Sequence, residues 1–446
     1  MTEINLLPWK KWNAPVGIAP LVHFRILFGL LMLISLIRFV AKGWITEQYL
    51  KPTFHFKYFG FHWVQCPDEP ILYGLFGLLM LSCVCIMLGL FYRTAIISFF
   101  LGFSYVELID ATNYLNHYYF ISLIAFLLIL VPANKCCSLD VQIGLCKQQV
   151  HAQRWQVGIL RAQMIVLYFF AGLAKLNPDW LLNAQPLAIW LSAKTNTPLI
   201  GNLLDETWVH YFFSWFGACY DLVIPFLLLN RRTVKLAFLL VVSFHLLTGL
   251  LFQIGMFPYV MIACASIFFS QDWHTNVLSK WSRLSLSQLG RLPIKTKSNK
   301  LFYAIIISYF FIQLILPLRF LAYPGSLFWT EQGYRFSWRV MLMEKAGYIT
   351  FTVKDGISGE SIVVDNQDFL TAYQEKMMAT QPDFILQFAH FLAKEYLKQG
   401  LNKPEVYAES YVAINGRPSK RFIDNSVNLA AQTDTWKPKT WILPSE

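Results

Sequence analysis

Long apolar stretches separated by short polar loops occupy the first three quarters of the chain. A helix that crosses a bilayer needs about 20 mostly apolar residues. Stretches near that length lie at about 25–41, 71–90, 94–110, 118–132, 158–174, 208–229, 234–252, 256–270 and 301–322. Several are close to the short limit, so the number of spans can differ from nine by about two. The pattern predicts an all-α polytopic membrane bundle of about nine spans over residues 1–324.

The pattern changes after residue 324. The segments "YITFTVKDGISGESIVVD" and "EVYAESYVAINGRPSKRFID" each predict a pair of strands around a Gly-containing turn, the second at Asn415–Gly416. Between them, "PDFILQFAHFLAKEYLKQG" predicts an amphipathic helix that ends at Gly400. Its apolar face consists of Ile385, Phe388, Leu392 and Tyr396. We therefore expect residues 325–446 to form a small α+β, β-rich domain outside the membrane.

The composition supports a membrane protein. Hydrophobic residues make up 56% of the chain and charged residues only 14%, whereas soluble domains carry about a quarter charged residues. The N-terminus, "MTEINLLPWKKWNAPVG", lacks the features of a cleaved signal peptide, so the first apolar segment is expected to remain as a span. None of the eight cysteines lies beyond Cys264, and their spacing matches no zinc signature, so we expect no metal site.

The distribution of Lys and Arg predicts the orientation. The net charge of +11 is explained by basic residues in the predicted loops, and nucleic acid is not an expected partner. One side of the predicted bundle holds Lys10, Lys11, Arg93, Lys135, Lys147, Arg154, Arg231, Arg232, Lys235, Lys280, Arg283, Arg291, Lys295, Lys297 and Lys300. The short loops of the other side hold only Lys42, Lys51, Lys57 and Lys194. Because basic loops stay in the cytoplasm, we expect a cytoplasmic N-terminus and an extracytoplasmic C-terminal domain.

The segment between the last two predicted spans has its own pattern. In "VLSKWSRLSLSQLGRLPIKTKS", apolar residues recur among basic ones. They are Leu278, Trp281, Leu284 and Leu289. This pattern predicts that the loop 271–300 carries a helix lying on the anionic cytoplasmic surface of the membrane.

Several polar residues fall at one depth near the outer end of the bundle. Lys175 ends the fifth apolar stretch in "YFFAGLAKLNPDW", Asp110, Asn116 and His117 lie in the hairpin "ELIDATNYLNHYYF", and His245 lies in the outer half of the seventh span. Taken alone, Lys175 can be a lysine that extends to the interface, and each of the others a structural polar group. Their gathering from three distant hairpins indicates a functional site.

The chemistry of a dehydrated lysine suggests a role for that site. Loss of hydration disfavours the ammonium form and lowers the pKa of such a lysine, which makes the amine a usable base at neutral pH. With His and Asn partners at membrane depth, it suits a lipid-soluble acid such as a phenol or a hydroquinone. The chain has no phosphate-binding loop, no dinucleotide glycine motif, no HExxH and no GxSxG. The polar stripes expected of a channel are also missing.

At these residues the chain resembles the vitamin K-dependent γ-glutamyl carboxylase family, which has an HTTM-type membrane domain. The similar segments are "IMLGLFYR", "LIDATNYLNHYYF", "ILRAQMIVLYFFAGLAKLNPDW", "FHLLTGLLFQIGMFPYVM", "QGYRFSWRVML", "FTVKDGISGE" and "YVAINGRPSKRFID". The resemblance implies a membrane enzyme of two coupled reactions. Reduced vitamin K (the hydroquinone) reacts with O2 to give an epoxide by way of a strong base, which removes a γ-proton from peptide glutamate, and CO2 then adds.

The resemblance also implies residue roles. Lys175 is the base that deprotonates the hydroquinone, and His117 serves the carboxylation half. Asn116 is implied to help hold the cofactor, and Asp110 and His245, at the same depth, are further cofactor-binding candidates. From the segment "QGYRFSWRVML", Trp338 and Arg339 are candidates for binding the peptide or protein substrate.

The chain departs from the family pattern in the outer domain. Phe54 and His390 stand where animal members have a cysteine pair, and Met343 or a neighbour replaces a histidine. Two other functions therefore remain open: oxidation of a reduced naphthoquinone without efficient carboxylation, and a non-enzymatic membrane module. The membrane is expected to be a bacterial inner membrane or an endoplasmic reticulum. The sequence does not determine the oligomeric state.

Overall fold

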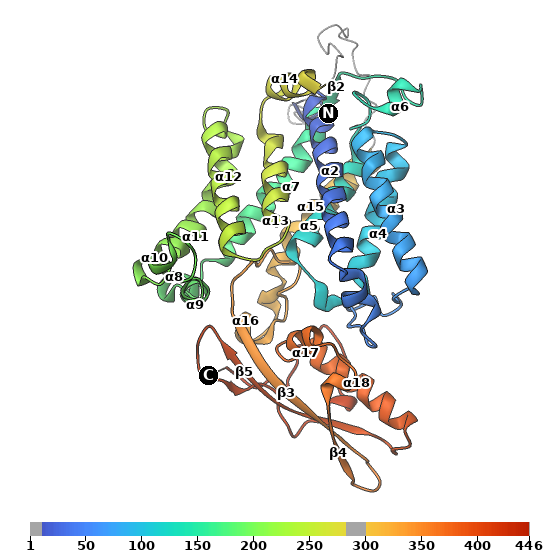
Figure 1. The fold of residues 1–446 in the computed structure, drawn as a ribbon, viewed down its shortest axis with the longest axis vertical. Coiled ribbons are helices and arrows are strands. Elements are labelled where there is room, and N and C mark those ends of the chain that lie inside the picture. The colour runs from blue at the N-terminus through green and yellow to red at the C-terminus, as the bar shows by residue number, and fades with distance from the viewer. Residues whose placement is uncertain (1–10, 282–299, 446) are drawn as a thin grey trace, which may run out of the picture.

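A computed structural model describes residues 11–281 and 300–445 of the chain. A tall helical domain stands above a smaller domain that contains the strands β3 to β6 (Figure 1). Seven described helical segments are long and apolar enough to cross a membrane. They are α2 (Ala19–Ala41), α3 (Glu69–Leu88), α4 (Tyr92–Ile109), α7 (Arg154–Ala174), α11 (Thr207–Leu229), α12 (Val234–Leu251) and Leu301–Ala322, which comprises α15 (Lys300–Ile315) and a 3-10 helix. The chain is therefore a multi-pass membrane protein.

The two remaining apolar stretches form shorter helices. α5 (Asn116–Leu130) occupies the fourth predicted position, and α13 (Phe257–Ala265), continued by a 3-10 turn, occupies the eighth. Every apolar stretch expected to be a span is thus helical, but the count of nine spans stays a prediction because these two are short. Both begin close to residues of the candidate site.

Glycines set the closest contacts between helices. A side chain at Gly172 of α7 would meet Leu222 of α11 at 2.8 Å, and one at Gly29 of α2 would meet the backbone of Cys83 at 2.7 Å. Small residues of this kind allow membrane helices to pack with their backbones close together. The approach at Gly172 brings the C-terminal end of α7, where Lys175 lies, directly against α11.

Small elements that the apolar pattern did not predict connect α7 to α11. These are α8 (Pro178–Asn183), α9 (Leu187–Ser192) and α10 (Gly201–Leu204), which form the lobe at the left of the helical domain (Figure 1). The side chain of Asn177 accepts a hydrogen bond from Trp180 N and so caps the start of α8. A two-stranded sheet of β1 (Pro15–Gly17) and β2 (His151–Gln153) was also not predicted.

The C-terminal domain contains the predicted strands in one antiparallel sheet. The sheet order is β4 (Ser361–Val364), β3 (Lys345–Lys354), β5 (Glu405–Ile414) and β6 (Lys420–Arg421). The turn after β5 uses Asn415 and Gly416 at φ of 50° and 75°, the left-handed conformation that these residue types tolerate best. The strand pairs and their turns therefore agree with the prediction.

The predicted amphipathic helix covers one face of this sheet. α18 (Pro382–Lys398) follows α17 (Ala372–Met378) and buries Ile385, Phe388 and Leu392 in one core with the strand residues Phe351 and Val412. The helix ends before Gly400, whose φ of 105° favours glycine. The apolar spacing read from the sequence thus identified the buried face of this helix.

The C-terminal domain is fixed to loops at the end of the helical domain. Phe54 packs against Phe391 of α18, with ring centroids 4.7 Å apart. Phe54 and His390, the neighbour of Phe391, are the two positions that correspond to the cysteine pair of animal relatives. The side chain of Gln387 donates to Lys57 O and accepts from Lys57 N. Apolar and hydrogen-bonded contacts therefore connect this loop to the C-terminal domain.

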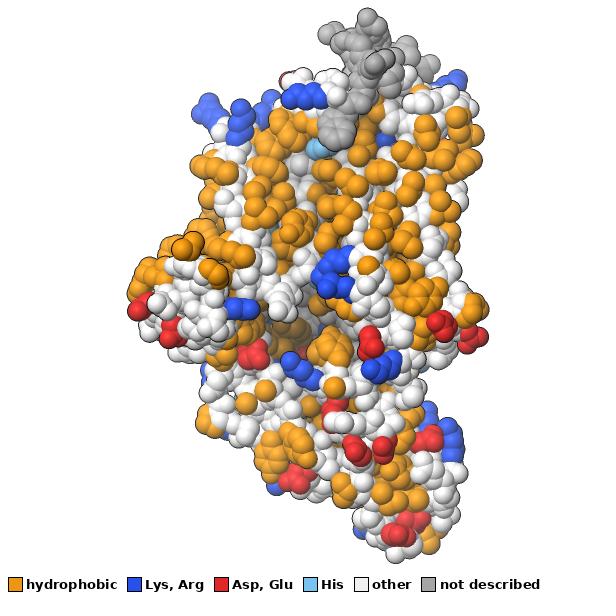
Figure 2. Space-filling view, in the orientation of Figure 1, with side chains coloured by type: hydrophobic (Ala, Val, Ile, Leu, Met, Phe, Trp, Pro, Cys, Tyr) orange, Lys and Arg blue, Asp and Glu red, His pale blue; other side chains and the backbone are white. Residues whose placement is uncertain are grey.

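The predicted orientation can be tested on this architecture. The N-terminal end of the described chain and α14 (Gln271–Trp281) lie at one end of the molecule, and the C-terminal domain lies at the opposite end (Figure 1). On the visible face, apolar side chains form a broad band between these ends (Figure 2). Of the four apolar residues of the predicted surface helix, Leu278 is buried. The side chain of Trp281 and the whole of Leu284 and Leu289 lie outside the part of the chain that the structure describes, so the surface helix stays a prediction.

We expect a reporter fused after Glu446 to be active only if it works outside the cytoplasm, because the basic loops belong to the opposite side. Alkaline phosphatase and green fluorescent protein fused at the same position make a matched pair with opposite requirements. Fluorescence without phosphatase activity would show that the predicted parity of the spans is wrong.

Candidate active site

Lys175 lies at the point where α7 ends, inside the protein rather than at its surface. Its side chain is only 8% exposed, and its Nζ donates to Ala171 O at 3.3 Å and lies 5.3 Å from the centre of the Trp180 ring. The Trp180 indole is held in turn by its N–H, which donates to Ser214 O of α11 at 2.8 Å. The cap of α8 and this bond to α11 therefore position an aromatic ring against the lysine.

Lys175 has a buried partner that was not predicted. Its Nζ lies 2.6 Å from Oδ2 of Asp221 on α11, and the Asp221 side chain is also 8% exposed. A carboxylate at this distance can stabilise the ammonium that forms when the amine accepts a proton. The amine and the carboxylate together, rather than an isolated dehydrated amine, therefore form the acid–base unit of the site.

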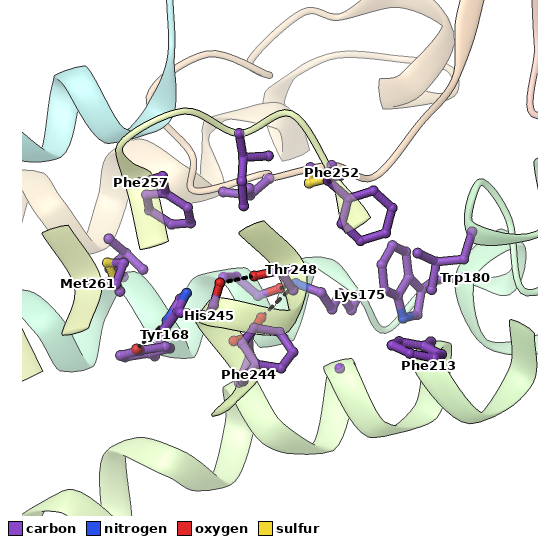
Figure 3. A pocket seen from close by; sticks show the side chains of 18 residues that line it. Tyr168, Lys175, Trp180, Phe213, Phe244, His245, Thr248, Phe252, Phe257 and Met261 are labelled. Carbon is purple, nitrogen blue, oxygen red and sulfur yellow. Dashed lines mark hydrogen bonds and ion pairs between the residues drawn. The ribbon is translucent and has the colours of Figure 1, made fainter. Parts of the chain in front are cut away.

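An apolar cavity, here called the lysine cavity, surrounds this pair (Figure 3). Most of its lining is aromatic or aliphatic, and its polar groups come from Tyr168, Lys175, Asp221, His245 and Thr248. Its apolar lining includes Leu167, Trp180, Phe213, Phe244, Phe252, Phe257 and Met261. A cavity of this composition accepts a flat aromatic molecule with few polar groups.

His245 presents an unused nitrogen in the lysine cavity. Its Nε2 lies 3.0 Å from the hydroxyl of Tyr168, whereas its Nδ1 is buried without a hydrogen-bond partner among the described residues. A buried polar atom without a partner is costly, and a ligand that bonds to it removes that cost. The two polar groups of a hydroquinone fit a cavity that offers Lys175 and this nitrogen within aromatic walls.

A second cavity of about 610 Å³, here called the histidine cavity, lies next to the first. His117, at the start of α5, lines it, and no other described residue hydrogen-bonds to its ring. The two cavities share Ile254, Phe257, Val340 and Met341, and the Phe257 ring lies 5.7 Å from that of His117 and 5.8 Å from that of His245. The shared residues form an apolar wall between the cavities. Lys175 and His245 lie on one side of this wall, and His117 lies on the other.

Part of this wall belongs to residues 334–343, here called the strap. Phe336, Trp338 and Met341 of the strap have positive φ values of 61°, 60° and 53°, which cost side-chain-bearing residues roughly 1–3 kcal/mol each. Burial of Trp338, whose ring stacks on Tyr119 at 5.0 Å, holds the strap in this conformation. Strained backbone is often found at functional sites, and here it carries Met341 to the wall.

Asn116 fastens the strap to α5. Its Oδ1 accepts from the hydroxyl of Tyr114 at 3.0 Å, and its Nδ2 donates to Arg339 O at 2.9 Å. The Tyr114 hydroxyl also accepts from Phe336 N. Asn116 lines the histidine cavity, but not the lysine cavity, so its predicted contact with the cofactor stays a prediction.

Asp110 lies away from both cavities. Its Oδ1 accepts from Thr112 N and Oγ1, and its Oδ2 accepts from Gln374 Nε2 of α17 at 2.8 Å. Burial raises the pKa of Asp110, and these hydrogen bonds act in the opposite direction. The structure therefore places Asp110 where the hairpin meets the C-terminal domain, and its role in cofactor binding stays a prediction.

Neither residue expected to bind substrate lines the two cavities. Trp338 is fully buried, and its Nε1 has no described partner. Arg339 lines a separate cavity of about 870 Å³, and its Cζ lies 4.4 Å from the Phe320 ring. Burial lowers the pKa of Arg339. Their roles in substrate binding stay predictions, and the strap to which they belong has the clearer structural role.

The residue missed by sequence reasoning is Asp221. It is the single acidic residue of "SWFGACYDLVIPFLLL", an apolar stretch predicted to span the membrane. Like Lys175, Asp221 is an ionisable group in an apolar stretch predicted to span the membrane, and such groups are usually functional. The sequence therefore contained a signal for Asp221. Its pairing with Lys175 could be seen only from the contact between α7 and α11 in the structure.

Comparison with protein-family models gives two matches that together cover most of the chain. Residues 13–273 match the HTTM domain, and residues 298–446 match the vitamin K-dependent gamma-carboxylase, lumenal domain. No solved structure was found to match the chain. The two matched domains occur in the order that the sequence segments indicated, and the chain belongs to the vitamin K-dependent γ-glutamyl carboxylase family.

Proposed function

We propose that the protein carboxylates the γ-carbon of peptide glutamate in a reaction coupled to epoxidation of reduced vitamin K. The observation that carries this proposal is the pair of adjoining cavities, one with Lys175 and Asp221 and the other with His117. When bound, reduced vitamin K supplies, by reaction with O2, the strong base that removes the glutamate γ-proton. A lipid-soluble cofactor and a peptide substrate require two adjoining sites of this kind.

The residues of the lysine cavity bind and deprotonate the hydroquinone in this proposal. Lys175 Nζ accepts a hydroxyl proton, and the Asp221 carboxylate stabilises the resulting ammonium. The free Nδ1 of His245 bonds to the cofactor, and its other nitrogen is fixed by Tyr168. The aromatic lining excludes water, which would otherwise consume a strong base before it met glutamate.

A second function, oxidation of a reduced naphthoquinone without efficient carboxylation, has one observation in its favour. Lys175, Asp221 and His245, the residues assigned to the hydroquinone, all line the lysine cavity, and none of them lines the histidine cavity. This function uses the lysine cavity alone.

The proposed function is tested with the purified protein in lipid nanodiscs. The assay supplies reduced vitamin K, O2, labelled bicarbonate and a short glutamate-containing peptide, and measures both the epoxide and the label fixed in the peptide. We expect both products. Epoxide without fixed label would favour the second function, and the absence of both products would contradict the proposal.

His117→Ala is expected to reduce carboxylation more than it reduces epoxide formation, because His117 lines only the histidine cavity. Loss of a residue that moves a proton or polarises a reactant lowers the rate by about 10²–10⁴-fold. The measurement is the ratio of fixed label to epoxide. His151→Ala, in β2, is the matched control. If His117→Ala gave the same ratio of label to epoxide as wild type, His117 would have no specific role in carboxylation.

A further inference from the structure

The histidine cavity contains two cations that have no anionic partner in the part of the chain that the structure describes. Arg38, near the end of α2, and Lys42, just beyond it, line this cavity with His117. Among the described residues, neither cationic group makes an ion pair or a hydrogen bond through its side chain. Both lie over the ring of Trp44, at 5.0 Å for Arg38 Cζ and 5.8 Å for Lys42 Nζ. The Trp44 ring therefore positions two cations that remain available to an anion.

None of the described residues that line the histidine cavity is acidic, so none of them neutralises these charges. The adjacent cavity of about 400 Å³, which shares Lys42 and Trp44 with it, contains Glu47. That carboxylate is already paired with Lys51 at 3.1 Å. A cavity with two unpaired cations attracts an anion, since the cavity focuses the field of both.

The other polar lining groups suit a peptide. Side-chain amides of Gln48, Asn113, Asn116 and Gln253 line the histidine cavity, and such groups can bond to peptide N–H and C=O groups. On the face shown in Figure 2, both basic and acidic side chains lie around a hollow between the helical domain and the C-terminal domain. The lining chemistry favours a peptide over a lipid, whose acyl chains would meet these amides.

We propose that Arg38 and Lys42 bind the γ-carboxylate of the substrate glutamate and hold it beside the wall shared with the lysine cavity. This inference rests on the proposed function and adds residues for which nothing else indicates a role. It explains how a peptide carboxylate reaches a site next to the membrane, where an unpaired anion is strongly disfavoured. It also sets specificity, because a glutamine side chain offers these cations no charge.

The same two cations assist the reaction chemically. The γ-C–H bond of glutamate breaks, its proton passes to the base supplied through the bound cofactor, and the remaining electron pair forms a bond with the carbon of CO2. The substrate side chain thus goes from one negative charge to two, first as a carbanion next to a carboxylate and then as two carboxylates. Cations placed where this charge develops lower the barrier.

The test compares binding of a fluorescein-labelled glutamate peptide with that of its glutamine analogue, by anisotropy, to the protein in phosphatidylcholine nanodiscs. A hydrogen bond to a charged group typically corresponds to a factor of ~10–100 in affinity. We expect wild type to prefer the glutamate peptide by about that factor, and Arg38→Gln and Lys42→Gln to lose most of the preference. Arg38→Lys, which keeps the charge, should retain part of it.

Epoxide formation without peptide is measured in the same samples, because Arg38 and Lys42 do not line the lysine cavity. It should stay at the wild-type rate, which also shows that the variants are folded. Lys194→Gln removes a cation that lines neither cavity and is the matched control. An equal glutamate preference in wild type and both glutamine variants would overturn the proposal and leave the Lys175 chemistry intact. The proposal would also be overturned if wild type did not prefer the glutamate peptide to its glutamine analogue. It would be overturned as well if the site were occupied only by phosphatidylglycerol, when this lipid is included in the nanodiscs, and not by the peptide.

Discussion

Lys175→Ala is expected to lower vitamin K epoxidation by about 10²–10⁴-fold, the usual effect of removing a general base. Carboxylation should fall with it, because the base that acts on glutamate is generated only after the hydroquinone is deprotonated. Both rates are measured in nanodiscs together with the yield of folded, membrane-inserted protein. Lys175→Arg should be almost as inactive as alanine, since a guanidinium keeps its proton at any working pH.

The substitution leaves Asp221 buried without its cation, which can destabilise the fold. The double variant Lys175→Ala/Asp221→Asn removes the remaining charge and is therefore the matched control for folding. If Lys175→Ala formed epoxide at the wild-type rate, Lys175 would be a structural ion-pair partner, and the assignment of the base would be wrong.

Asp221→Asn is the second substitution with a large expected effect. The amide has nearly the shape of the carboxylate but cannot neutralise the ammonium that Lys175 becomes on accepting a proton. The maximal rate of epoxidation should fall by roughly 10²-fold or more, because a lysine without a countercharge is a weaker base.

The rate measurement on Asp221→Asn has a matched control. Asp179→Asn also removes a carboxylate, but Asp179 pairs with Arg417 of the C-terminal domain rather than with Lys175. A wild-type rate of epoxidation in Asp221→Asn would show that Asp221 takes no part in the chemistry.

The apolar stretches of the sequence predicted the helices well because membrane spans need long runs of apolar residues. The amphipathic spacing of Ile385, Phe388 and Leu392 likewise identified the face of α18 that is buried on the sheet. The short helices α8 to α10 were missed because polar and apolar residues alternate there without a clear period. Contacts such as Asn177 capping α8, rather than hydrophobic pattern, define them.

The candidate site shows the same limit of sequence reasoning. Lys175, His117 and His245 stood out as polar residues in apolar surroundings, and the structure places them around two adjoining cavities. Asp110 stood out for the same reason but bonds to Gln374 of the outer domain. Depth in the membrane can be read from a sequence, whereas the direction in which a side chain points depends on helix packing. The pairing of Lys175 with Asp221 required the close approach at Gly172.

The central claim is that the amine of Lys175 is the base that deprotonates the hydroquinone. The most direct test is rescue of Lys175→Ala by a small primary amine, measured as epoxide formed by the variant in nanodiscs. We predict that epoxide formation rises and saturates with amine concentration, follows the free-amine fraction as pH changes, and is weaker in Lys175→Ala/Asp221→Asn, which cannot hold the ammonium. Folded Lys175→Ala that formed no more epoxide with amine than without it would contradict the claim.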